Sequence, residues 1–226
     1  MVVPSNPVMR KLIRLFSAPI LLYGVSFLKG TFILGSISAL FSGTSCLGPL
    51  MGAYLGLGGS FLYSLVKFVV AFFLLGKGSL TILVYHIPGL CASASWATRH
   101  AVVNVGIPVL CIAAFLAHPV GLSAGVLSLY WVVPIVIWMK NKKGTWAIAL
   151  SSTFIAHAVG TVIWLYTHDT TTQFWWALVP LVAVERLIYA AGMVSIYTVV
   201  NYVRGCRPMV GRYATAMIRF LGIGYA

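Results

Sequence analysis

Two carboxylates and five histidines are the side chains of this 226-residue chain best suited to proton transfer or ligand binding. Asp169 sits in a threonine-rich stretch, whereas Glu185 lies within a long apolar run. An ionisable side chain in a membrane-crossing run costs about 2.5–3.5 kcal/mol, so it usually faces the protein interior or a water-filled cavity and has a partner. Arg186 follows directly but points about 100° away around a helix, so we expect that the two side chains do not simply neutralise each other.

His157 is the predicted partner of Glu185. If the runs 145–167 and 174–203 form an antiparallel helix pair that turns near residue 170, the depths of the two residues differ by about 3 Å at a rise of 1.5 Å per residue. We therefore expect His157 and Glu185 to approach each other near the middle of the membrane.

Polar and aromatic residues surround this predicted pair. Residues three or four apart share one helical face. The face of His157 also carries Thr153, Thr161 and Trp164, and Glu185 is followed four residues later by Tyr189. Such a patch is typical of a binding cavity for a small polar molecule. A hydrogen-bond network that only joins the two helices is the alternative.

Two interruptions of the apolar runs also bear on a binding site. The sequence Tyr85-His86-Ile87-Pro88-Gly89 predicts a break at depth, and such backbone is tolerated only where protein or a water-filled cavity satisfies it. We therefore include His86 among the predicted ligand-binding residues. His118-Pro119 predicts an external turn. The four cysteines have no C-x-x-C spacing, so neither a metal site nor a disulfide is predicted. No cofactor is predicted either.

The composition excludes a soluble protein. Hydrophobic residues make up 61% of the chain and charged residues 8%, with a mean hydropathy of +1.00, whereas soluble domains carry about 25% charged residues. Since a crossing helix needs about 20 apolar residues, we predict an all-α, polytopic transmembrane bundle of six to eight helices that forms a single integral membrane domain over 1–226. The predicted helices are 12–28, 31–50, 52–76, 79–98, 101–117, 122–139, 145–167 and 174–203.

The basic residues predict an orientation. The net charge is +13, and the lysines and arginines gather at the two ends of the chain and in the loop 140–143. Basic residues accumulate in cytoplasmic loops, so both termini are predicted to be cytoplasmic, and we expect the bacterial cytoplasmic membrane as the location. No basic face interleaves with exposed aromatic residues, so nucleic acid is not a predicted partner.

Small residues recur at four-residue spacing in two stretches. The first is Gly35, Ala39 and Gly43, and the second is Gly48, Gly52, Gly56, Ser60 and Ser64. On a helix, such a stripe lets another backbone approach closely. The stripe predicts either tight packing within the fold or a groove for a partner or ligand. The glycines around Gly56 would also permit a break in the helix.

The scale, the helix number, the predicted termini and the stretch Gly48-Pro49-Leu50-Met51-Gly52-Ala53-Tyr54-Leu55-Gly56 resemble the S components of energy-coupling-factor vitamin transporters. The resemblance implies capture of a vitamin-like molecule, with ATP hydrolysed on separate subunits. Gly35, Ala39 and Gly43 are similar to the face that contacts the transmembrane coupling subunit. The chain itself has no G-x-x-x-x-G-K-[ST] phosphate loop.

Three alternatives remain. His100-x-x-x-Asn104, Gly121-Leu122-Ser123-Ala124-Gly125 and Ala156-His157-Ala158-Val159-Gly160 resemble the motifs of rhomboid serine proteases. That resemblance would make Ser123 the nucleophile, His157 its base, and His100 with Asn104 the oxyanion stabilisers. The others are a non-catalytic membrane scaffold and a cation-coupled carrier with Glu185 as the ion site. Our principal prediction is a non-enzymatic, membrane-embedded protein that binds or transports a small molecule.

Overall fold

The structure is a computed structural model that describes residues 29–30, 41–69, 72–73 and 81–220. Its elements are β1 (Lys29–Gly30), β2 (Phe41–Ser42), α2 (Gly43–Val69), α3 (Thr81–Ala97), the π-helix η2 (Val102–Gly106), α4 (Ile107–Ala117), α5 (Pro119–Ser123), the 3-10 helix η3 (Gly125–Trp131), α6 (Val132–Met139), α7 (Thr145–Thr167) and α8 (Thr172–Phe220). Two-residue strands β1 and β2 pair antiparallel, and the other described elements are helices. The predicted all-α class is confirmed.

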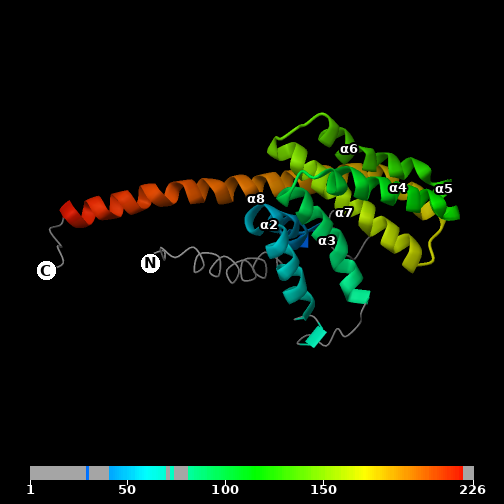
Figure 1. Ribbon diagram of the computed structural model, residues 1–226, viewed down its shortest axis with the longest axis horizontal. Helices are drawn as coiled ribbons and strands as arrows, with labels where there is room; N and C mark the ends of the chain where they lie inside the picture. The colour runs from blue at the N-terminus through cyan, green and yellow to red at the C-terminus, as the bar shows by residue number, and fades with distance from the viewer. Residues whose placement is uncertain (1–28, 31–40, 70–71, 74–80, 221–226) are drawn as a thin grey trace.

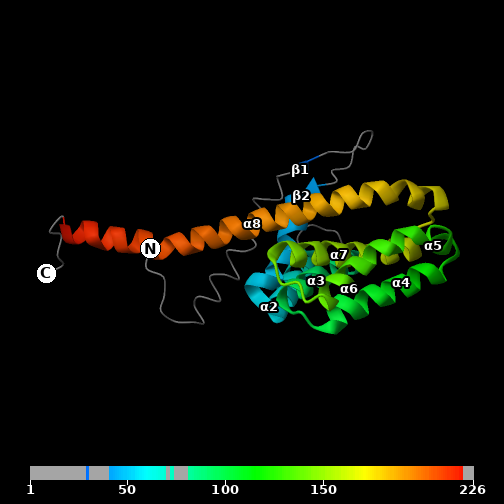
Figure 2. The ribbon, with the colours of Figure 1, turned by 90° about the horizontal axis from the view of Figure 1, so that it is seen from above.

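Helix α7 lies at the centre of the described bundle. It packs against α3, α4, α6 and α8. Helices α2 and α3 form a closely packed pair beside it (Figure 1). Helix α8 runs along the bundle and then continues well beyond it, as the view from above shows (Figure 2). Its C-terminal half is continuous helix, so the predicted end at residue 203 is wrong.

The N-terminal boundaries differ from the prediction. The predicted helices 31–50 and 52–76 are joined, because α2 runs from Gly43 through residue 51 to Val69. The break lies at Gly56, where φ is 70° and ψ is −174°. Glycine has no Cβ and adopts this conformation without the strain that other residues would suffer. The predicted helix 12–28 lies outside the described residues.

Helix α3 crosses the predicted interruption. It is continuous from Thr81 to Ala97 with Pro88 inside it, so the predicted break around His86 is wrong. The second interruption is confirmed as a turn: α4 ends at Ala117, His118 is extended, and Pro119 opens α5. The His118 ring accepts a hydrogen bond from the Val120 N–H at 3.3 Å and so caps that helix.

Two buried clusters hold the helices together. In one, Phe115 packs edge to face against both Trp131 and Trp175, with ring centroids 5.2 and 5.6 Å apart. The other joins the start of α2 to α8 around Leu50 and Met193. Edge-to-face aromatic pairs contribute about 0.5–1.5 kcal/mol beyond the burial of their area.

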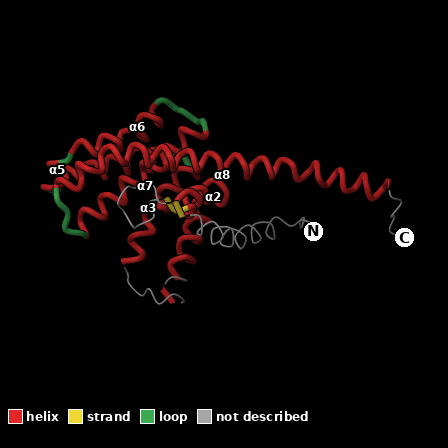
Figure 3. The backbone as a smooth tube through the Cα atoms, turned by 180° about the vertical axis from the view of Figure 1, so that it is seen from behind, coloured by secondary structure: helices red, strands yellow, loops and turns green. Residues whose placement is uncertain are grey.

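The exterior is apolar. Large hydrophobic side chains such as Leu110, Leu129 and Met139 are mostly exposed. Within the described residues, three helical stretches are long and apolar enough to cross a membrane: Cys46–Val66, Thr145–Thr167 and Thr172–Tyr202. An apolar surface of this extent is unusual on a soluble monomer. Together these features indicate a helical membrane protein. Figure 3 shows that helices make up most of the described backbone.

Helices α2 and α3 lie very close together at Gly52. A Cβ atom at this position would overlap the backbone carbonyl of Ser93. This is the packing role that the small-residue stripe predicts, and it requires glycine at this one position.

We expect Gly52→Ala to destabilise the protein, because α2 and α3 must separate to admit the methyl group. Overpacking of this kind costs about 1–3 kcal/mol. The measurement is thermal unfolding of the detergent-purified protein. The control is Gly58→Ala in the same helix, where an added Cβ meets nothing within 4 Å. Equal unfolding temperatures for the two variants would contradict the close contact.

Candidate functional site

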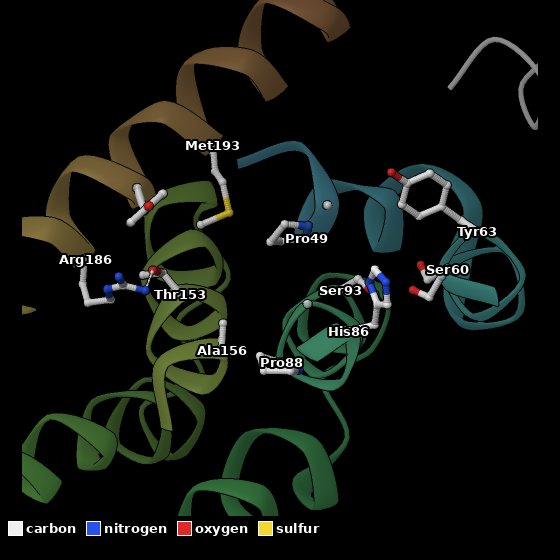
Figure 4. A pocket seen from close by; sticks show the side chains of 14 residues that line it. Pro49, Ser60, Tyr63, His86, Pro88, Ser93, Thr153, Ala156, Arg186 and Met193 are labelled. Carbon is white, nitrogen blue, oxygen red and sulfur yellow. Dashed lines mark hydrogen bonds between the residues drawn. The ribbon is translucent and has the colours of Figure 1, made fainter. Parts of the chain in front are cut away.

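A central cavity of about 310 Å³ lies between α2, α3, α7 and α8. All four helices contribute side chains to it, as the close view shows (Figure 4). Its polar lining includes Ser60, Ser64, His86, Ser93, Thr153 and Arg186. Ligand pockets measure about 300–1,000 Å³, so this one has the size for a small ligand.

Helix α2 forms one wall with its stripe of small residues. Gly48 lies before the Gly56 kink and Ser60 after it, and both line the cavity. The Ser60 hydroxyl donates to the Gly56 carbonyl at 2.8 Å. On α3, the Ser93 hydroxyl donates to the Leu90 carbonyl at 3.0 Å. Because both protons are used inside their own helices, these two oxygens present lone pairs as acceptors.

Arg186 forms the opposite wall, on α8. Its Nη2 donates to Glu185 Oε2 at 3.0 Å, and its Nη1 donates to Thr153 Oγ1 at 3.4 Å. Its guanidinium carbon lies 4.7 Å from the centre of the Tyr189 ring. The Nε atom is buried and, among the described residues, has no hydrogen-bond partner. An unsatisfied buried donor costs about 1–3 kcal/mol, more when it is charged.

The ion pair between Glu185 and Arg186 corrects the expectation that these neighbours do not neutralise each other. Their side chains are only 18% and 14% exposed. Although the two Cβ atoms point in different directions, both side chains are long enough to close the gap. In apolar surroundings water does not hydrate either charge, so each side chain is stabilised by the other.

His157 does not bond to Glu185, so the predicted partnership is wrong. Its Nδ1 accepts a hydrogen bond from the buried Trp131 indole at 3.1 Å, and its Nε2 lies 3.4 Å from Thr161 Oγ1. In the described part of the chain no hydrogen bond or ion pair joins it to Glu185. Its angular position around the α7 axis points the ring toward Trp131 instead.

The predicted patch is divided between two cavities. Thr153, Tyr189 and His86 line the central cavity. A second space of about 250 Å³, here the aromatic cavity, is lined by His157, Gly160, Thr161, Trp164, Phe174, Trp175 and Leu178. Glu185 is not among the residues that line either cavity. Of the predicted partner face, Gly43 begins α2, and Gly35 and Ala39 lie outside the described residues.

The structure adds residues that sequence reasoning did not assign to the site. Arg186 is the second ionisable residue of the same apolar run, which is a signal for a functional residue, but its spacing indicates only that it neighbours Glu185. Ser60 belonged to the small-residue stripe. Ser93 carried no signal in the sequence, because a lone serine in an apolar helix is common.

The residues of the protease-like motifs do not assemble. The Ser123 hydroxyl is exposed and donates to the Pro119 carbonyl at 3.0 Å. Asn104 is buried and accepts from Ser95 at 3.0 Å. Since His157 is bonded to Trp131 and Thr161, no described hydrogen bond links a serine nucleophile to this base. The geometry offers no support for serine catalysis.

Comparison with protein-family models, with curated proteins and with solved structures finds no match to this chain. The functional argument therefore depends on the geometry of the site.

We expect Trp131→Phe and His157→Leu to show energetic coupling in a double-mutant cycle. Each single substitution leaves one buried partner of the 3.1 Å bond unsatisfied, whereas the double variant removes both. The coupling free energy should be about 0.5–1.5 kcal/mol, measured by unfolding in detergent.

The control pair is Trp138→Phe with His157→Leu. The Trp138 indole donates to the Arg99 carbonyl instead, so these two costs should add to within about 0.3–0.5 kcal/mol. Additive costs for the Trp131 and His157 pair would show that their bond does not contribute to stability.

Proposed function

We propose that this chain is a membrane-embedded protein that binds a small polar molecule in the central cavity. The observation that carries the proposal is Arg186 in the wall of this cavity, because the described residues leave some of its guanidinium donors without a hydrogen-bond partner. A ligand that accepts hydrogen bonds from the guanidinium would satisfy such donors.

The cavity favours binding over a purely scaffolding role. Packing alone would fill the space between four helices with apolar side chains at a density near that of organic crystals. Here the space is instead edged by hydroxyl groups, a histidine and an arginine. Polar groups placed around a space of this size are typical of a site for a ligand or for ordered water.

Uptake across the membrane is the form of this function that we propose. The chain would capture the substrate, and separate transmembrane coupling and ATPase subunits would supply the energy. Gly35, Ala39 and Gly43 are the proposed contact for the coupling subunit, with both termini in the cytoplasm. The resemblance to the S components of energy-coupling-factor transporters supports this form.

We expect at least one member of a panel of vitamins and small metabolites to raise the unfolding temperature of the purified protein. A ligand at a hundredfold excess over its Kd stabilises by about 2.7 kcal/mol. Gly48→Met should abolish the response, because the new side chain would enter the central cavity from a position where an added Cβ meets nothing within 4 Å.

The matched control is Gly58→Met. Gly58 is equally open, lies in the same helix and is not among the residues that line the central cavity. It should keep the full response. A ligand that still stabilises Gly48→Met binds elsewhere, and a panel without any stabilising compound would favour the scaffold alternative.

A further inference from the structure

Arg186 has unused hydrogen-bonding capacity at the central cavity. A guanidinium group has five N–H donors. Among the described residues, one donor of Nη1 bonds to Thr153, one of Nη2 bonds to Glu185, and Nε has no partner. The Thr153 bond is long at 3.4 Å, and Figure 4 shows it at the edge of the cavity.

The position of Arg186 is fixed before any ligand arrives. Glu185 holds one end of the guanidinium at 3.0 Å, and the Tyr189 ring lies against its face at 4.7 Å. A pre-positioned fork loses less side-chain entropy on binding than a freely rotating one. The planar donors of arginine match the two oxygens of a carboxylate.

The charge around the cavity also favours an anionic group. Arg186 brings a full positive charge to the wall, and neither carboxylate of the chain is among the described residues that line it. Glu185 is not among the residues that line the cavity, and its bond to Nη2 reduces the positive charge of the guanidinium without cancelling the other donors.

The wall of the cavity opposite Arg186 offers hydrogen-bond acceptors instead of donors. The oxygens of Ser60 and Ser93 can act only as acceptors toward a ligand, because their own protons are bound to backbone carbonyls. These two residues lie across the cavity from Arg186 in Figure 4. A ligand would therefore be oriented with its acceptor end toward α8 and its donor end toward α2 and α3.

We propose that the central cavity takes a small organic carboxylate, bound by unused N–H donors of the Arg186 guanidinium, with hydrogen-bond donors at the other end of the molecule. This inference depends on the proposed binding function and specifies its ligand class.

The test compares carboxylates with their own neutral amides on the full-length protein in detergent. The probes are acetate, benzoate, 4-aminobenzoate and 6-aminohexanoate, each at millimolar concentration beside its amide, with thermal stabilisation as the readout. Carboxylates should bind more tightly than their amides by about tenfold, which is about 1.4 kcal/mol. 4-Aminobenzoate should bind more tightly than benzoate.

Two variants at α8 should shift this preference in opposite directions. Arg186→Gln should remove the advantage of the carboxylates over the amides. Glu185→Gln keeps the size of the side chain and an oxygen that can still accept from Arg186 Nη2, but it removes the competing negative charge. It should therefore strengthen carboxylate binding several-fold and leave amide binding unchanged. If Arg186→Gln does not fold, the gain in Glu185→Gln still tests the inference.

The outcomes separate this inference from the proposed function. If amides bind as tightly as carboxylates, or if Glu185→Gln leaves carboxylate binding unchanged, the binding function stands and the ligand class is wrong. A metabolite panel whose hits are all uncharged, with no response to the carboxylates, also overturns the ligand class alone. If neither the panel nor the carboxylates stabilise the protein, both proposals fall.

Discussion

A charged side chain inside an apolar bundle needs a partner, and the ion pair between Glu185 and Arg186 meets that need within one helix. This has a consequence for the site. Because Arg186 takes its counter-charge from its own neighbour, α8 can carry it into the bundle without a carboxylate from another helix. Thr153 on α7 and the ring of Tyr189 then fix the direction of the guanidinium. Arg186 so held lines the central cavity, and its Nε has no hydrogen-bond partner among the described residues.

The irregular segments obey a related constraint, since polar backbone groups in apolar surroundings need partners inside the protein. The π-helical turn Val102–Gly106 contains Asn104, whose side-chain oxygen accepts from Ser95 and Ser151 and whose nitrogen donates to the Thr98 and His100 carbonyls. All four hydrogen-bonding positions of this amide are therefore used. The departure from α-helical geometry therefore lies where the Asn104 side chain joins η2 to α3 and α7 by hydrogen bonds.

The sequence predicted where a residue lies along its helix better than it predicted the direction in which the side chain points around the helix axis. The runs 79–98 and 145–167 agree closely with α3 and α7, because charge-free length and flanking polar residues define both ends. The break at Gly56 followed from glycine chemistry. The pairing of His157 with Glu185 failed for a different reason: rise per residue sets depth, but the direction of a side chain depends on packing partners such as Trp131, which spacing within one helix does not reveal. Pro88 likewise stayed helical because the packing of α3 overrode a local preference.

The small-residue stripe of α2 shows how one pattern can serve two roles. At Gly52 the backbone of α2 is in contact with the Ser93 carbonyl, so the two helices cannot move closer. One turn earlier, Gly48 has open space where a Cβ would lie, and beyond the kink Ser60 faces the same space. The contact at Gly52 therefore sets how close α2 and α3 can lie, since packed backbones compress little. Tight packing and the open space of the central cavity thus lie one turn apart along the same stripe, so a small residue is needed at Gly52 for contact and at Gly48 for room.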